Sequence, residues 1–128
     1  MKYDFICGIG AHWAHSHPKL IESGINMALQ NSVMQGNLQQ NKIVIDLMKI
    51  LVESSQMDHV FLTTSGAMAV ENGLKIAFQN RFPAHRVLAF EGCFMGRTLA
   101  LSQITDKSMY RDGLPDTIQV DYVPFFDS

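Results

Sequence analysis

The spacing of apolar residues along the chain predicts several helices. Apolar residues recur every three or four positions over residues 18–30, 41–53 and 65–82, which is the period of a helix with one buried face. Pro18 suits the first turn of the first helix, and Ser65 is a favourable N-cap for the third. Pro83 is expected to end that third helix.

Short apolar runs elsewhere in the chain predict strands. They cover residues 59–63, 86–91 and 117–123. A short helix is expected over 99–104, and the polar, aperiodic residues 31–40 and 106–116 are expected to be connections. Because strands and helices alternate, we expect an α/β fold with right-handed crossovers, in which helices flank a mainly parallel sheet.

Two of the predicted strands end at turns of small residues, where a ligand site is expected. Ser65-Gly66-Ala67 follows the first strand and starts a helix, so its backbone N–H groups and the positive helix end suit a phosphate. A serine N-cap beside a glycine is also an ordinary way to begin a helix. No P-loop lysine accompanies these residues, which argues against a nucleoside triphosphate as the ligand.

The second turn, between Gly92 and Thr98, adds an aromatic ring and a cation. Phe94 lies between two glycines, where its ring can leave the core and lie flat on a planar ligand. The guanidinium of Arg97 can pair with a carboxylate. A core ring and a structural ion pair are the ordinary alternatives for two such residues. Taken together, they predict a site for an aromatic phosphate ester and a carboxylate substrate.

Composition narrows the classes of function. Hydrophobic residues make up 47% of the chain and charged residues 17%, which is typical of a globular domain. The formal net charge is −2 and the basic residues are scattered, so neither nucleic acid nor a membrane is expected as a partner. No apolar stretch approaches the roughly 18 residues of a membrane span, and the first residues do not resemble a signal peptide. We therefore expect a cytoplasmic protein.

The positions of cysteine and histidine give little reason to expect a metal. Cys7 and Cys93 do not have the spacing of a zinc site. His12, His15 and His17 lie close together, but no acidic or thiol side chain lies within their cluster. We expect these histidines to form hydrogen bonds with the backbone of their own loop, and we expect no metal site.

Motifs that occur in the same order resemble those of the class III aminotransferases of the ornithine, acetylornithine and 4-aminobutyrate type. These enzymes use pyridoxal 5′-phosphate on the fold type I scaffold. The matching segments are residues 3–10, Ala14-His15-Ser16-His17-Pro18, residues 61–77 around Ser65-Gly66-Ala67, Phe94-Met95-Gly96-Arg97-Thr98, residues 110–115 and residues 122–127. The resemblance covers nearly all of the chain.

The resemblance implies a role for each residue of the two turns. Ser65, Gly66 and Ala67 would hold the cofactor phosphate through backbone N–H groups and the serine hydroxyl. Phe94 would stack on the pyridine ring, and Arg97 would bind a substrate carboxylate. The implied reaction transfers an amino group between an ornithine-like or acetylornithine-like ω-amino acid and 2-oxoglutarate, in an enzyme that is a homodimer.

The resemblance also implies a division of the chain and a missing part. Residues 1–38 would be an N-terminal segment, and residues 39–128 a partial cofactor-binding large domain of fold type I. The family's reaction needs a lysine that holds the cofactor and an aspartate that pairs with its ring nitrogen. Both are expected after Ser128, so we expect no catalytic residue in this chain. We therefore expect a fragment that is inactive by itself.

Departures from the family pattern leave an alternative open. Met68 replaces a glutamate at the helix start, so the capping box there is lost. Met95 replaces a histidine or tryptophan beside the stacking ring, which puts cofactor packing in question. The alternative is a non-catalytic remnant that binds a phosphorylated ligand or associates with a complementary chain. A dinucleotide-binding module is poorly supported, because Gly8-Ile9-Gly10 is not followed by the third glycine of that motif.

Overall fold

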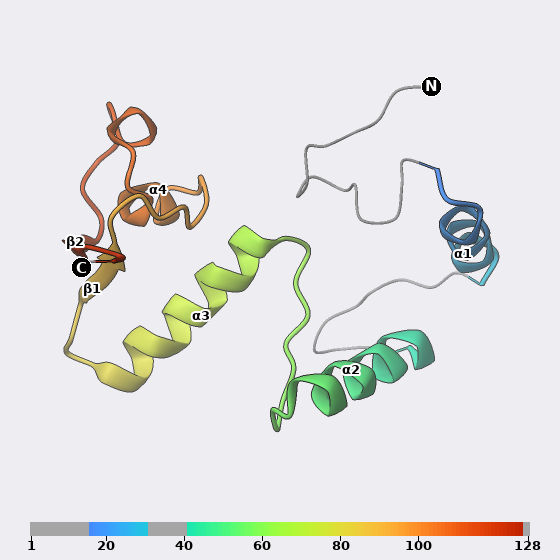
Figure 1. Cartoon of the computed structure of the whole chain (residues 1–128). Coiled ribbons are helices and arrows are strands. Elements are labelled where there is room, and N and C mark those ends of the chain that lie inside the picture. The colour runs from blue at the N-terminus through green and yellow to red at the C-terminus, as the bar shows by residue number, and fades with distance from the viewer. Residues whose placement is uncertain (1–15, 31–40, 127–128) are drawn as a thin grey trace. The chain divides into compact units, whose positions relative to one another are not determined.

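The computed structural model describes residues 16–30 and 41–126, which belong to two compact units (Figure 1). One unit comprises residues 1–60 and the other residues 61–128. The connection expected over 31–40, and with it the expected division after residue 38, lies outside the described residues.

The described part of the first unit consists of two helices, α1 (Pro18–Leu29) and α2 (Lys42–Ser55). Both confirm the helices that the apolar period predicts. Asn41 caps α2 by accepting a 2.9 Å hydrogen bond from the Val44 N–H, and Gln56 ends the helix in the left-handed conformation. Neither helix has a buried residue.

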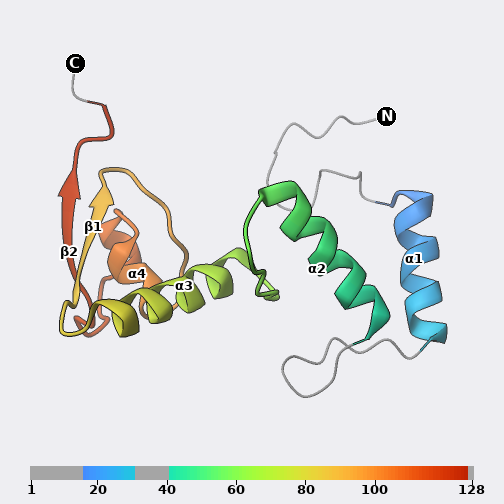
Figure 2. The ribbon, with the colours of Figure 1, turned by 90° about the horizontal axis from the view of Figure 1, so that it is seen from below.

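The second unit contains the elements α3 (Gly66–Arg81), β1 (Arg86–Phe90), α4 (Leu101–Ile104), the 3₁₀ turn η1 (Ser108–Tyr110) and β2 (Gln119–Val123). The strands pair in parallel, in a register from Arg86 opposite Gln119 to Phe90 opposite Val123. Figure 2 shows them side by side and pointing the same way. The predicted α/β class and parallel pairing are confirmed.

The prediction of a strand over residues 59–63 is wrong. Among the described residues the sheet has two strands, β1 and β2, and neither pairs with this segment. An apolar run becomes a strand only where a neighbouring strand takes its backbone hydrogen bonds. The segment is also not buried, since the Phe61 side chain is 66% exposed.

The core of the second unit lies at α4. Leu101, Ile104 and Thr105 are completely buried, although the helix itself is a single turn. Thr98 starts this turn by accepting a 3.1 Å hydrogen bond from the Leu101 N–H. The helix therefore begins two residues later than the pattern predicts, and its burial rather than its length holds it in place. No helix of residues 16–30 and 41–126 is long and apolar enough to cross a membrane.

Candidate functional site

The N-terminus of α3 has the geometry of an anion-binding helix end. Ser65 is extended (φ −159°, ψ 161°), and its Oγ accepts a 3.2 Å hydrogen bond from the Met68 N–H. Thr63 Oγ1 donates a 3.0 Å hydrogen bond to the Ser65 carbonyl, which fixes the approach to the helix. The N–H groups of Gly66 and Ala67 have no acceptor within α3, because the first turn of any helix leaves such donors unpaired. The space beside Gly66 is open, since a Cβ there would meet no atom within 4 Å.

The turn after β1 presents the other two expected site residues to solvent. We call residues 92–98 the glycine turn; it starts at Gly92, whose φ of +71° suits glycine. The Phe94 ring is 59% exposed, so it leaves the core as the sequence predicts. Arg97 is also exposed and forms no ion pair with any described residue.

The two segments meet at Gly96, which is buried. A Cβ on Gly96 would lie 3.3 Å from the Ala67 Cβ and 2.7 Å from Leu101 Cδ1. Its φ of +139° is one that L side chains rarely adopt. A second link joins the same segments, because Thr98 Oγ1 donates a hydrogen bond to the Glu71 carboxylate of α3. The start of α3 and the glycine turn are therefore packed against each other.

Two residues that the sequence analysis did not single out, Thr105 and Asp106, hold the glycine turn through hydrogen bonds to its backbone. Thr105 Oγ1 accepts hydrogen bonds from the Met95 N–H (3.0 Å) and the Gly96 N–H (3.3 Å). It donates one in turn to the Gly96 carbonyl (2.9 Å). The Asp106 carboxylate accepts a 2.7 Å hydrogen bond from the Gly92 N–H. No local motif marks a threonine whose partners lie nine and ten residues earlier.

Arg111 and Tyr122 support the end of α4. Arg111 Nη1 donates to the Thr105 carbonyl (3.0 Å) and to the Tyr122 hydroxyl (2.8 Å), and that hydroxyl donates to the Ile104 carbonyl (3.0 Å). Burial raises the pKa of Tyr122 above its ordinary value of 10.0, against the opposite effect of the Arg111 guanidinium. A neutral hydroxyl and a charged arginine therefore link α4 to β2.

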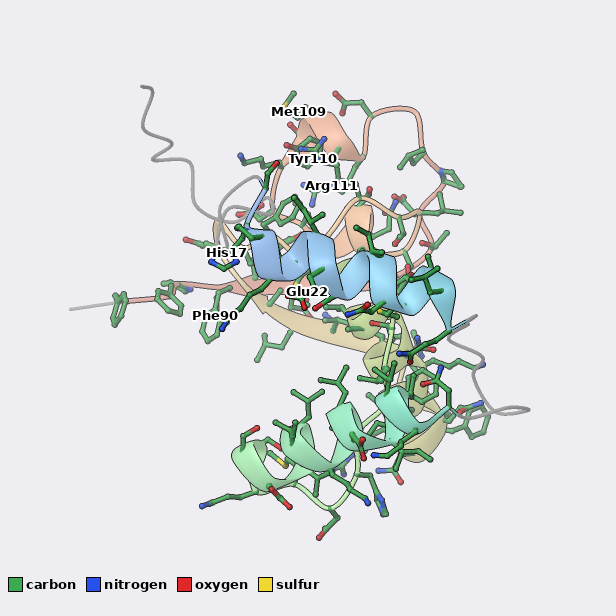
Figure 3. The ribbon with its side chains drawn as sticks, turned by 90° about the vertical axis from the view of Figure 1, so that its right-hand side faces the viewer. His17, Glu22, Phe90, Met109, Tyr110 and Arg111 are labelled. Carbon is green, nitrogen blue, oxygen red and sulfur yellow. The ribbon has the colours of Figure 1, made fainter. Side chains whose placement is uncertain are left out.

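Tyr110 contacts both exposed residues of the glycine turn. Its ring lies edge-to-face against the Phe94 ring, with centroids 6.3 Å apart and planes at 74°. The Arg97 guanidinium carbon lies over the same ring, 4.9 Å from its centroid. Figure 3 labels Tyr110 beside Arg111 on the loop that contains η1. In the sequence, Tyr110 belongs to a segment that resembles the family, residues 110–115, but no role was predicted for it.

Of the three clustered histidines, the structure describes His17 alone. Its Nδ1 accepts a 3.2 Å hydrogen bond from the Lys19 N–H, so His17 is the N-cap of α1 (Figure 3). His17 therefore bonds to backbone as expected, but to the first turn of α1 rather than to its own loop, while His12 and His15 lie outside the described residues. Within the part of the chain that is described, no group of histidine, cysteine or acidic side chains has the arrangement of a metal site.

Comparison with known proteins gives consistent matches along the chain. The family model described as aminotransferase class-III matches residues 1–127. The acetylornithine aminotransferase of Methanocaldococcus jannaschii is 37% identical over 139 aligned residues, which cover 98% of this chain and 33% of that protein. The acetylornithine aminotransferase of Brucella melitensis is 34% identical over 131 residues, covering 97% of this chain and 32% of that protein.

Solved structures match in fold. An ornithine aminotransferase from Toxoplasma gondii, whose description mentions partial occupancy of PLP at its active site, aligns with a TM-score of 0.74 and 22% identity, covering 88% of this chain and 28% of that one. A second structure of the ornithine aminotransferase from Toxoplasma gondii, strain ME49, gives a TM-score of 0.75 at 20% identity, covering 87% of this chain and 28% of that one. The chain spans about a third of the length of the curated relatives that it matches.

Proposed function

The chain belongs to the class-III aminotransferase family, and from this premise we propose that it supplies the phosphate-binding and carboxylate-binding part of a pyridoxal 5′-phosphate-dependent aminotransferase. The proposed reaction transfers an amino group between an ω-amino acid, such as ornithine or acetylornithine, and 2-oxoglutarate. The relatives named acetylornithine aminotransferase support this substrate class.

One observation carries the proposal. Ala67, at the start of α3, lies within van der Waals reach of Gly96, in the middle of the glycine turn. This contact joins the start of α3, with its unpaired helix N–H groups, to the turn that contains the exposed Phe94 and Arg97 side chains, and it supports a single site. A phosphate, a planar ring and a carboxylate are the three groups that such a site recognises.

The residues at the start of α3 fit the cofactor's phosphate. The Gly66 and Ala67 N–H groups would donate to phosphate oxygens, and the positive end of α3 favours their negative charge. Ser65 Oγ is engaged as an acceptor, so its own O–H remains able to donate to the same phosphate. The open space beside Gly66 leaves room for that group. Bound pyridoxal 5′-phosphate supplies the electron sink that amino-group transfer needs.

Phe94 and Arg97 would orient the ring and the substrate. The exposed face of Phe94 offers a stacking surface for the pyridine ring. Arg97 has no acidic partner among the described residues, so its N–H groups are available for a bidentate pair with a carboxylate. Such a clamp orients the substrate and restricts its motion before reaction.

We assign binding rather than catalysis to these residues and propose that the 128 residues do not transaminate by themselves. Lys75 lies in α3, more than two turns beyond Ser65, and we give it no role in the reaction. The division at residues 38 and 39, the homodimer and the cytoplasmic location stay predictions.

The proposal is tested by removing a single phosphate donor. Gly66 is the first residue of α3, where proline is tolerated, and the extended Ser65 has the conformation that a following proline requires. Gly66→Pro therefore deletes one N–H and leaves the helix intact. We expect it to weaken binding of pyridoxine 5′-phosphate, measured by titration calorimetry, at least tenfold. This probe has no aldehyde and cannot react with lysines.

The matched control is Lys42→Pro, which places proline at the same position of α2, after the extended Asn41. It should leave binding of pyridoxine 5′-phosphate unchanged. Equal binding by wild type and Gly66→Pro would contradict the phosphate site. Binding of inorganic phosphate with the same affinity as pyridoxine 5′-phosphate would contradict the assigned role of Phe94.

A further inference from the structure

Tyr110 contacts both of the residues that the proposed function places against the ligand's ring and the substrate. The geometry places the Arg97 guanidinium over the face of its ring at 4.9 Å and the Phe94 ring against its edge or face at 6.3 Å. The proposed function gives Tyr110 no task. Its hydroxyl makes no hydrogen bond with any described residue, so the contacts of Tyr110 in this site are those of its ring.

We propose that Tyr110 is a positioning residue for Arg97: its ring holds the guanidinium in the place from which Arg97 binds a substrate carboxylate. The proposal rests on the role that the proposed function gives Arg97. A guanidinium over an aromatic ring uses its flat face for that contact. Its N–H groups point outward in the guanidinium plane and stay free for a carboxylate.

Arg97 needs such support because little else fixes its side chain. It is exposed and has no ion pair among the described residues. A free arginine loses much rotamer freedom when it binds a ligand, and this loss weakens binding. A ring that already holds the guanidinium reduces the loss.

Tyr110 itself is on a fixed piece of backbone. Its N–H donates a 3.1 Å hydrogen bond to the Lys107 carbonyl, and the next N–H, that of Arg111, donates to the Ser108 carbonyl at 2.7 Å. The Arg111 side chain then binds the carbonyl of the buried Thr105. The ring is therefore anchored to the same core that holds the glycine turn.

The charge around the ring favours an anion as the ligand. Lys107 Nζ lies 6.0 Å from the Tyr110 centroid, so the ring has two cations near it. Neither Arg97 nor Lys107 pairs with an acidic side chain of the described residues. Two unpaired cations beside one ring are suited to a dicarboxylate, the class to which 2-oxoglutarate belongs.

The position of Arg97 can be observed by NMR on the ¹⁵N-labelled full chain. A group over an aromatic face has its proton resonances shifted upfield by the ring current. We expect an upfield Arg97 Nε–H resonance, assigned by its loss in Arg97→Lys. Tyr110→Phe should keep the shift and Tyr110→Leu should abolish it. The wild-type shift requires no substitution at Tyr110, so an unshifted resonance overturns the proposal even if Tyr110→Leu does not fold.

A titration with glutarate, a dicarboxylate without reactive groups, then tests the effect on binding. Tyr110→Leu should weaken glutarate binding about two- to fivefold, the range expected for one exposed cation–π contact. Tyr110→Phe should restore wild-type affinity, which loss of the fold would not allow. Equal affinity in wild type and Tyr110→Leu overturns the proposal.

The two proposals fail in different ways. If wild type binds no glutarate while Arg97 shows the upfield shift, Arg97 does not bind a substrate carboxylate. That result overturns the carboxylate-binding part of the proposed function and the positioning role of Tyr110. If wild type binds glutarate and Arg97 shows no shift, only the role of Tyr110 is overturned.

Discussion

The helices α1 and α2 are capped by local hydrogen bonds, whereas the glycine turn is held by residues distant from it in sequence. The caps of the two helices come from residues adjacent to them, His17 and Asn41, and neither helix has a buried residue. The glycine turn instead depends on Thr105 and Asp106, which lie well after it in the chain. One region is specified locally and the other by contacts across the fold.

This difference explains which substitutions matter in each region. A helix with an exposed apolar face loses only local hydrogen bonds when one cap is removed. The glycine turn, whose Gly96 is buried, loses a contact that several backbone groups share when Thr105 is changed. Substitutions of the residues that hold the glycine turn should therefore cost more stability than substitutions in α2.

The largest loss of unfolding free energy is expected for Gly96→Ala. The added Cβ would lie 2.7 Å from Leu101 Cδ1, at a φ of +139° that alanine rarely adopts. Overpacking and backbone strain together should cost about 3 kcal/mol. Urea denaturation followed by circular dichroism measures this change. As a control, Gly24→Ala, in the exposed helix α1 with no atom within 4 Å of the new Cβ, should not destabilise the chain.

The next largest loss of stability is expected for Thr105→Val, which keeps the shape of the side chain and removes its hydroxyl. The Gly96 N–H would then be buried without an acceptor. Leaving a buried donor unpaired should cost about 2 kcal/mol. Hydrogen exchange of the Met95 and Gly96 amides measures the local effect. Exchange as slow as in wild type would show that the turn does not depend on Thr105.

The same contrast accounts for how much of the fold the sequence predicted. The helices 18–30, 41–53 and 65–82 follow from period and caps, because those signals lie within the helices themselves. The strand expected over 59–63 failed because pairing depends on a neighbouring strand that the local pattern does not contain.

The candidate site shows the same limit. Ser65, Phe94 and Arg97 carry recognisable chemistry in their own turns, so the sequence identified them. Thr105 and Tyr110 act through contacts with residues nine or more positions away, and no spacing rule connects them. Their roles appear only when the folded chain brings α4, η1 and the glycine turn together.

A smaller effect, with a distinctive pH dependence, is expected for Tyr122→Phe. At pH 7 the loss of the hydroxyl's bonds to Arg111 and Ile104 should cost about 1 kcal/mol. Because burial raises the pKa of Tyr122 in the folded chain above 10.0, its stabilisation is complete below pH 10 and is lost as pH rises from there through the folded value. The difference in unfolding free energy between wild type and variant should therefore shrink above pH 10. A constant difference from pH 8 to 11 would contradict this assignment.

The smallest effect is expected for Asn41→Ala, which removes the 2.9 Å hydrogen bond to the Val44 N–H at the start of α2. Loss of an N-cap on a helix without buried residues should cost about 0.5 kcal/mol, at the low end for such substitutions. Faster amide exchange should be confined to the first turn of α2, while the Met95 and Gly96 amides should exchange as in wild type. Because Ser65→Ala removes the equivalent cap of α3, it should speed exchange at Met68 and also weaken binding of pyridoxine 5′-phosphate. If Asn41→Ala weakened that binding as much, the site would depend on α2 and the contrast between the two regions would not hold.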